Sequence, residues 1–324
     1  MSFVRLRRLR RNQQIRDLIS QTQLSVKDLI MPYFVIEGRN KRESIASMPG
    51  LYHLSVNNLI EDIREAKRLG IKAILLFGVS QKKDGMGLES YRKNGIMQKA
   101  IKAIKKNIKD IVIITDVCLC GYTSHGHCGV LKTQDTIIDN DETLKILAKI
   151  ALSHAEAGVD FVAPSAMMDG QVRAIRETLD RKGFRDVGII AYSAKYASNF
   201  YGPFREALDS CPQFGDRKSY QLDFRNQDEA LREIKQDIDE GADIIMVKPA
   251  LAYLDVIYRA KQNFHIPIAC YNVSGEYSLV KIASQEGIFN EKDTVLEILT
   301  SFKRAGANLI ITYHAKEVAR WLKD

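Results

Sequence analysis

The sequence predicts one α/β domain, a closed TIM (β/α)8 barrel with an N-terminal arm and an active-site lid after the fifth strand. Apolar strand-like runs alternate with helix-period stretches from about residue 29 to residue 321, and there are eight of each. A weak internal repeat supports this reading, because Gly70, Gly158, Gly241 and Gly306 each separate a helix-period stretch from the next apolar run. Glycine at these places fits a left-handed cap at the C-terminus of a helix.

The expected strands are continuously apolar for most of their length, as parallel strands covered on both faces should be. In chain order they are Ile30–Ile36, Ala73–Val79, Ile111–Val117, Phe161–Ser165, Gly188–Ser193, Ile244–Lys248, Pro267–Asn272 and Leu309–Tyr313. Pro32 weakens the case for the first strand, because proline lacks the N–H group that a hydrogen-bond ladder needs.

The stretches between these runs have the apolar period of helices that pack on one face. Leu59, Ile63 and Ala66 form such a stripe in one stretch, and Leu144, Leu147 and Ala151 form one in another. We expect the helix after Asn226 to begin with a capping box that ends at Glu229. That helix should turn Ala230, Leu231, Ile234 and Ile238 inward.

We expect residues 1–27 to form the arm and residues 28–324 to form the barrel domain. Six arginines lie within the first 16 residues, and the chain has a net charge of +8. A nucleic-acid-binding arm and an arm that packs on a neighbouring subunit are both compatible with this charge. The interleaved leucines favour packing, and the rest of the chain has mixed charge without a nucleic-acid-binding motif.

The predicted lid covers about residues 196–224, between the fifth strand and its helix. A connection of this length is typical of a lid or of a disordered segment. Its aromatic and arginine side chains are unlike a disordered composition, so we expect an ordered lid over the barrel mouth.

Composition indicates an ordinary globular protein, with 45% hydrophobic and 27% charged residues. No stretch approaches the roughly 20 apolar residues of a membrane span. The arginine-rich start has no apolar segment of the kind that a secretory signal needs, whereas a transit peptide shares its composition. We expect a cytoplasmic protein.

Lys195 and Lys248 carry the clearest chemical signal, because each ends an apolar strand-like run. A lysine buried there avoids an uncompensated charge by losing its proton, and a second amine nearby depresses the pKa further. Lowering a lysine pKa from about 10.4 to about 7 corresponds to roughly 4 to 5 kcal/mol. A neutral amine can condense with a ketone to form a Schiff base. In the alternative, each lysine extends to solvent at the barrel rim.

Three of the five cysteines, Cys118, Cys120 and Cys128, lie within eleven residues after the third strand. Three thiolates can bind a tetrahedral zinc and leave the fourth position for water or substrate, as in catalytic zinc sites. In the alternative, the thiols are packed and free, and nearby histidines are satisfied in a turn. His127 could replace or join a cysteine ligand, but we place it outside the metal ligands.

Other polar residues stand near expected strand ends and could complete a pocket with the two lysines. They are Asp116, Ser165, Ser193, Ser274 and Tyr313. On the lid, Arg205 and Arg217 could bind a substrate carboxylate, or could be surface charges. His154 is expected in the core, and Glu233 taken alone reads as a solvated charge.

Together these residues closely resemble the 5-aminolevulinate dehydratase family, also called porphobilinogen synthases, along nearly the whole chain. Five pieces carry the resemblance: Ala191–Ser198 with Phe200–Arg205, Gly215–Lys218, Met246–Ala250, Tyr271–Tyr277 and the cysteine cluster. The resemblance implies a hydro-lyase of tetrapyrrole (haem) biosynthesis. It would condense two molecules of 5-aminolevulinate asymmetrically into porphobilinogen, with loss of two waters.

The resemblance also implies roles for individual residues. Lys248 would form the Schiff base with the substrate in the P subsite, and Lys195 would be the second active-site lysine, which can engage the substrate in the A subsite. Ser274 and Tyr313 would bind the carboxylate of the P-side substrate. The carboxylate of the A-side substrate would be bound by Arg205, Arg217 and Gln221. Asp116 and Ser165 would orient this chemistry.

The cysteine cluster resembles the zinc-dependent type of the family. Glu233 matches a position that coordinates an allosteric magnesium in some members. Ser219 stands where some members have a cysteine for an additional zinc, so that further site is not expected.

The resemblance also implies a homo-oligomer, an octamer whose arms embrace neighbours or a hexamer with another arm orientation. We expect 5-aminolevulinate as the small-molecule partner, and neither nucleic acid nor membrane. Two other functions stay in view. A class I aldolase-like Schiff-base lyase needs one lysine and no zinc, and a basic zinc protein on nucleic acid leaves the strand-end lysines unexplained.

Overall fold

The computed structural model describes residues 3–132 and 136–323 and contains a closed parallel barrel. The barrel order is β1-β4-β5-β6-β7-β8-β9-β10, and β10 pairs back to β1. The barrel strands are β1 Leu29–Ile36, β4 Ala73–Val79, β5 Val112–Val117, β6 Phe161–Pro164, β7 Gly188–Lys195, β8 Ile244–Lys248, β9 Ile268–Asn272 and β10 Leu309–Thr312. All eight predicted strands are present, so the predicted TIM barrel is confirmed.

β1 includes Pro32, which stands in register with Leu75 of β4. Two short strands that we did not predict extend the sheet beside β1, namely β2 Arg42–Ser44 and β3 Tyr52–Ser55. β3 runs parallel to β1, and β2 pairs antiparallel with β3. The three residues of β2 are all exposed, so no apolar pattern marked it in the sequence.

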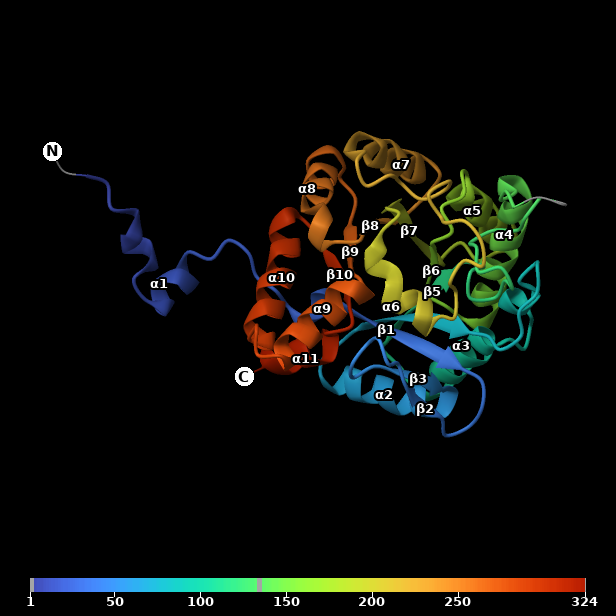
Figure 1. Cartoon of the computed structure of the whole chain (residues 1–324), viewed down its shortest axis with the longest axis horizontal. Helices are drawn as coiled ribbons and strands as arrows, with labels where there is room; N and C mark the ends of the chain where they lie inside the picture. Colours follow the sequence, from blue (N-terminus) through green and yellow to red (C-terminus); the bar gives the residue numbers. More distant parts are fainter. Residues whose placement is uncertain (1–2, 133–135, 324) are drawn as a thin grey trace.

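The helices form the outer ring of the barrel (Figure 1). The helices of this ring are α2 Val56–Arg68, α3 Ile96–Asn107, α4 Asn140–Ala157, α5 Gln171–Arg181, α7 Gln227–Asp239, α8 Leu254–Asn263, α9 Ser274–Gln285, α10 Glu291–Ala305 and α11 Ala315–Trp321. The four repeated glycines all have positive φ, between 100° and 119°. In α4 and α10 these glycines are the C-terminal caps, as predicted.

The predicted capping box of α7 is wrong in detail. Asn226 is the N-cap residue, but its side chain accepts no hydrogen bond from the first turn. Instead its amide donates to the Glu229 carboxylate at 3.2 Å. Ala230 and Ile234 are buried, and Leu231 and Ile238 pack against the core, so the predicted inward face is confirmed.

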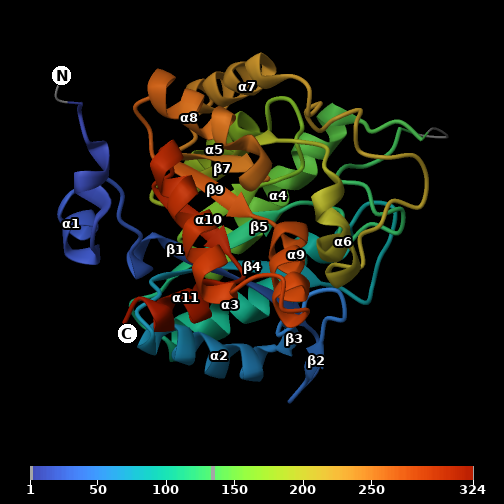
Figure 2. The ribbon, with the colours of Figure 1, turned by 60° about the vertical axis from the view of Figure 1, so that its left-hand side comes forward.

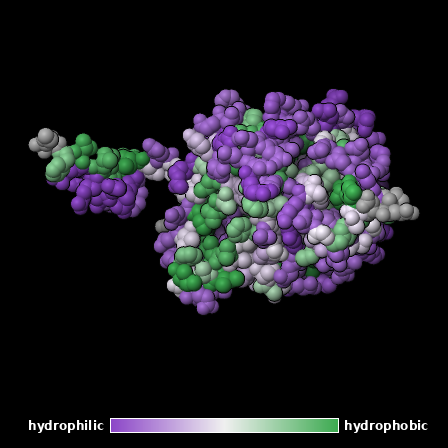
Figure 3. Space-filling view, turned by 45° about the horizontal axis from the view of Figure 1, so that its top comes forward, coloured by the Kyte–Doolittle hydropathy of each residue, from purple (hydrophilic) through white to green (hydrophobic). Residues whose placement is uncertain are grey.

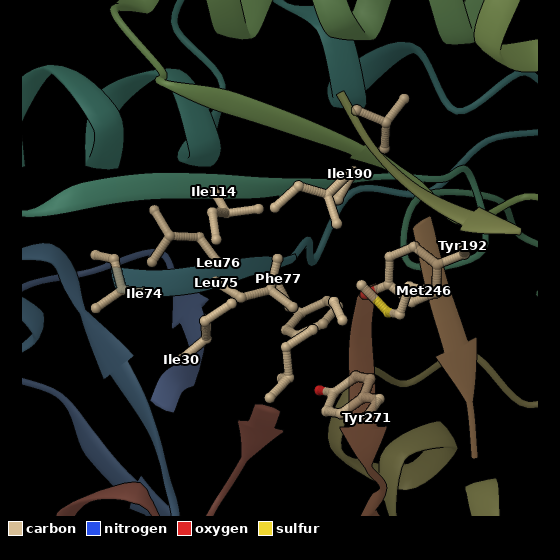
Figure 4. Packing of buried hydrophobic residues seen from close by; sticks show 14 of the residues in the cluster. Ile30, Ile74, Leu75, Leu76, Phe77, Ile114, Ile190, Tyr192, Met246 and Tyr271 are labelled. Carbon is tan, nitrogen blue, oxygen red and sulfur yellow. The ribbon is translucent and has the colours of Figure 1, made fainter. Parts of the chain in front are cut away.

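Large apolar side chains fill the barrel interior (Figure 4). Ile30, Leu75 and Phe77 belong to this packed core, and Tyr192 and Tyr271 lie toward its other end (Figure 4). Both tyrosines are fully buried. The interior is therefore a solid core that ends, on one side, in a layer of aromatic rings.

The segment from 196 to 224 is ordered and contains a short 3-10 helix, η4 Asn199–Tyr201, and α6 Gly202–Ala207. It lies over the barrel beside α9, against which α6 packs (Figure 2). Tyr201, Phe204 and Arg217 from this segment line one pocket with Lys195 and Lys248. We call residues 196–224 the lid from here on.

The N-terminal segment extends away from the barrel (Figures 1 and 2). It contains η1 Leu6–Arg10, α1 Gln13–Leu18 and η2 Val26–Asp28, none of which has a buried residue. Residues 1–2 of the predicted arm lie outside the described residues. Among the residues described, no helix is both long and apolar enough to cross a bilayer.

Candidate active site

A bulge in β7 brings the two lysines together. Lys195 ends β7, Lys248 ends β8, and their Cα atoms are register partners on these neighbouring strands. The β7–β8 register shifts between Ala191 and Ala194. In a regular strand, the side chains of residues three apart point to opposite faces of the sheet. A bulge between two such residues can bring their side chains to the same face. Here Lys195 Nζ lies 5.7 Å from the centre of the Tyr192 ring, so both side chains lie on the same side of the strand.

Lys248 is 4% exposed, and its Nζ lies among four aromatic rings. The ring centres are those of Tyr271 at 4.2 Å, Phe204 at 4.8 Å, and Tyr192 and Tyr201 at 5.2 Å each. We call these four residues the aromatic cage. Burial, with a contribution from the charge of Lys195, lowers the pKa of Lys248 to about 7. A large fraction of this amine is therefore neutral near neutral pH, as the sequence predicted.

Lys195 is 5% exposed, and its Nζ donates a hydrogen bond to the backbone carbonyl of Ser165. Neither lysine extends to solvent, so the alternative placement at the rim is wrong. Asp116 lines the same pocket. Burial raises the pKa of Asp116 to about 6, against the opposing effects of Ser165 and the two lysines. Asp116 can therefore exchange a proton near neutral pH.

The three clustered cysteines are buried free thiols at the end of β5. Their sulfur atoms all lie within 4.8 Å of one another, and Cys118 Sγ and Cys120 Sγ are 3.5 Å apart. Tetrahedral zinc with Zn–S bonds of about 2.3 Å requires sulfur separations of about 3.8 Å, so this cluster fits such an ion. Hydrogen bonds from Cys118 and Cys120, with the nearby charges of Arg217 and Lys195, hold the pKa of Cys128 well below its usual range.

The lid carries buried polar groups without protein partners. Arg205, Arg217 and Gln221 line a pocket of about 520 Å³, and Arg217 also lines the pocket that contains Lys195 and Lys248. Within the described residues, Nε of both arginines and both amide atoms of Gln221 have no hydrogen-bond partner. Burial and the neighbouring guanidinium of Arg217 lower the pKa of Arg205. Two guanidinium groups in one pocket and unsatisfied donors suit an anionic ligand such as a carboxylate.

The hydroxyl groups of Ser274 and Tyr313 both have protein partners. The Ser274 hydroxyl accepts from the Phe204 amide at 2.9 Å and donates to the Phe200 carbonyl at 3.2 Å. The Tyr313 and Tyr271 hydroxyls are 2.9 Å apart. Ser274 therefore contacts the lid, and Tyr313 reaches Lys248 through a ring of the aromatic cage.

Three other residues do not join this site. Ser193 was expected in the lysine pocket, but it hydrogen-bonds to Asp237 of α7 and lines a separate acidic pocket, so that prediction is wrong. Glu233 lines the same acidic pocket and is partly buried rather than simply solvated. His154 is a core histidine, as predicted, and its Nδ1 lies 2.9 Å from the Thr115 hydroxyl.

Sequence reasoning missed the aromatic cage. Tyr192 and Tyr271 read as ordinary residues of apolar strands, and only their spacing to the lysines could have singled them out. Tyr192 stands three residues before Lys195, a spacing that puts two side chains on opposite faces of a regular strand. The bulge that reverses this has no glycine or proline to mark it in the sequence.

Comparison with known proteins places the chain in one family. Residues 3–321 match the family model described as Delta-aminolevulinic acid dehydratase. A protein of that name from Bacillus subtilis (strain 168) is 51% identical over 323 residues, which are 100% of this chain and 99% of the relative. One from Methanothermus sociabilis is 56% identical over 316 residues, with 98% of each chain covered.

A solved structure agrees with these sequence matches. It is the crystal structure of delta-aminolevulinic acid dehydratase (porphobilinogen synthase) from Toxoplasma gondii ME49, in complex with the reaction product porphobilinogen. The TM-score is 0.96 at 46% sequence identity, and the match covers 99% of this chain and 92% of that one.

Proposed function

This chain belongs to the delta-aminolevulinic acid dehydratase family, and we propose a role in the family's reaction for each residue of its barrel site. The enzyme is a lyase with porphobilinogen synthase activity, a step of tetrapyrrole (haem) biosynthesis. Two molecules of 5-aminolevulinate condense into one porphobilinogen, and two waters are lost. The class I aldolase-like alternative is therefore set aside.

Lys248 begins the reaction as the Schiff-base lysine. Its neutral amine attacks the ketone carbon of the first substrate, and loss of one water leaves a protonated imine. The pKa of about 7 supports this role, because the nucleophilic form is abundant at neutral pH. The aromatic cage supports it as well, because ring faces stabilise the positive imine nitrogen and keep bulk water away. This environment of Lys248 is the observation that carries the proposal.

Lys195 and Asp116 handle protons beside the imine. Asp116 has a pKa of about 6 and lies in the pocket with both lysines, so it can accept and return a proton during water loss. The Ser165 carbonyl accepts a hydrogen bond from Lys195 and orients it, and we assign Lys195 to the second substrate. Ser165 thus positions both Lys195 and Asp116.

The two substrate carboxylates bind on opposite sides of the lysine pair. Arg205, Arg217 and Gln221 of the lid hold the carboxylate of the A-side substrate, and their unsatisfied polar atoms support this. Ser274 and Tyr313 hold the carboxylate of the P-side substrate. For that, each hydroxyl exchanges its present protein partner for a carboxylate oxygen.

Cys118, Cys120 and Cys128 hold zinc, which when bound supplies a Lewis acid that polarises an oxygen or amine of the A-side substrate. The thiolate donor set supports zinc over magnesium or calcium. Glu233 is proposed as a ligand for an allosteric magnesium. Burial raises its pKa, with contributions from Asp169 and Glu229, so a cation would relieve the repulsion in this acidic group.

The arm forms contacts between subunits in a homo-oligomer, most simply an octamer. Its exposed apolar side chains support this proposal, and they are Phe3, Val4, Leu6, Leu9, Leu18 and Ile19. A cytoplasmic location stays a prediction from sequence.

Pyrrole formation from 5-aminolevulinate tests the proposed function directly. The parent enzyme should form porphobilinogen, and a zinc chelator should lower the rate in a way that added zinc restores. Lys248→Ala should reduce turnover to background, whereas Lys106→Ala, at an exposed lysine of α3, should match the parent. Full turnover by Lys248→Ala would refute the role of this lysine, and unchanged turnover in metal-free buffer would remove zinc from the mechanism.

A further inference from the structure

The loop that carries the three cysteines is also the surface on which the lid rests. We call residues 118–129 the cysteine loop. The Gln213 amide of the lid donates to the His125 carbonyl at 3.1 Å, and Arg217 Nη2 donates to the Gly126 carbonyl at 2.8 Å. Gly126 has φ +72°, and a Cβ atom there would lie 2.3 Å from the Cys211 carbonyl oxygen. Lid and cysteine loop are thus in direct backbone contact.

His127 stands at the centre of this contact. It is 3% exposed, and both ring nitrogens contact the lid. Nε2 lies 3.0 Å from the Phe214 carbonyl oxygen, and Nδ1 lies 3.0 Å from the Tyr220 hydroxyl. The ring also packs against the Phe214 ring, with 4.6 Å between centroids.

The chemistry of the partners determines the direction of these hydrogen bonds. The Phe214 carbonyl can only accept, so His127 Nε2 carries a hydrogen and donates. The Tyr220 hydroxyl accepts from the Cys128 amide, at 3.4 Å, and can donate its own hydrogen to His127 Nδ1. The Cys128 amide, the Tyr220 hydroxyl, the His127 ring and the Phe214 carbonyl then form one continuous hydrogen-bonded chain.

This arrangement leaves His127 without a nitrogen for a metal. Among the residues described, the group that could hold a metal ion contains the three cysteines and no histidine. We propose that His127 is a positioning residue that latches the lid to the cysteine loop and is not a metal ligand. The proposal rests on the proposed function, because it assigns His127 to the closed lid that binds the A-side substrate.

The contact between His127 and Tyr220 also affects how the lid residues are placed relative to the cysteines. Arg217 and Gln221 lie on either side of Tyr220 in sequence, and Cys128 follows His127. Holding Tyr220 on His127 therefore positions the A-side carboxylate clamp relative to a metal-binding thiol. Loss of the latch should weaken binding of the A-side substrate, while the cysteines keep their metal and Lys248 keeps its cage residues from the barrel strands.

Three substitutions of His127 separate its two hydrogen bonds. His127→Leu removes both. His127→Gln can keep the donor to Phe214, because its amide nitrogen reaches the Nε2 position, and His127→Asn can keep the contact with Tyr220. Tyr220→Phe deletes the hydroxyl from the lid side and leaves His127 intact, which covers the case in which His127→Leu fails to fold. His265→Leu, at an exposed histidine after α8, is the matched control.

The holoenzyme variants would be compared by hydrogen exchange of residues 209–222, by zinc content per chain and by steady-state kinetics. For His127→Leu we expect lid exchange about tenfold faster or more, since two hydrogen bonds are lost, with smaller effects for Gln and Asn. KM should rise more than kcat falls, and zinc content and borohydride trapping on Lys248 should match the parent.

Two results would overturn the latch. One is zinc loss in step with lid exchange, which would make His127 a ligand. The other is lid exchange equal to that of His265→Leu, which would leave His127 no role in holding the lid. Loss of trapping on Lys248 in the parent enzyme itself would instead count against the proposed function, so the two failures are distinguishable.

Discussion

Two opposing effects act on the pKa of the Lys248 side chain. Aromatic ring faces favour its ammonium form, whereas removal from water disfavours it. The pKa falls from an ordinary 10.5 to about 7, so desolvation prevails, and the net shift corresponds to about 5 kcal/mol. In the proposed mechanism the same rings also stabilise the protonated imine. The imine is positively charged, although it forms from the neutral amine. The cage therefore suits both the nucleophile and the intermediate.

The cysteine thiols yield a prediction at the same scale. Replacing Cys118, Cys120 and Cys128 together with alanine should lower bound zinc and pyrrole formation in parallel, because no thiolate remains to hold the ion. Zinc content by atomic absorption and the pyrrole assay measure the two effects. Cys211→Ala, at an exposed cysteine of the lid, should leave zinc content unchanged. Full zinc content in the triple variant would place the metal elsewhere.

The site depends on elements as well as on residues. Strand ends at one face of the barrel carry Lys195, Lys248 and the cysteine loop, and these were predictable because a polar residue at the end of an apolar run stands out. The bulge in β7 was not predictable, since the register of two strands depends on their tertiary pairing. The exposed strand β2 was missed for a similar reason, because its pairing with β3 leaves no apolar pattern.

Arg205 of the lid lines a pocket with Arg217 and Gln221, and it is proposed to bind a substrate carboxylate. Arg205→Ala should raise KM for 5-aminolevulinate by about 10- to 100-fold, the usual effect of losing a hydrogen bond to a charged group. Arg205→Lys should recover part of this loss, because lysine keeps the charge without the planar fork. Arg185→Ala, at an exposed arginine, is the control. An unchanged KM in Arg205→Ala would remove this residue from the carboxylate clamp.

The whole molecule combines a dense barrel with an arm that makes few contacts with it. Hydrophobic residues are exposed on parts of both the arm and the barrel surface (green in Figure 3). The interleaved leucines and arginines were visible in the sequence and predicted an N-terminal arm, and the N-terminal segment does extend away from the barrel. The sequence does not indicate which surface would receive the arm, because the proposed contact is with another copy of the chain.

Assembly can be tested through the arm. Leu6→Asp combined with Leu9→Asp should reduce the particle mass in light scattering, because a charged residue is costly in an apolar contact. Both leucines are more than half exposed, so thermal unfolding of the barrel should change little. An unchanged mass would show that these leucines make no contact between subunits.

The central claim is that the buried amine of Lys248 is neutral near pH 7 and captures the first substrate. Borohydride reduction in the presence of 5-aminolevulinate, followed by peptide mass spectrometry at a series of pH values, tests it most directly. Because burial lowers the pKa to about 7, the amine is free above that pH, and the initial trapping rate should rise through a midpoint near 7 with the label on Lys248. A label on another lysine, or a midpoint near 10, would contradict the account.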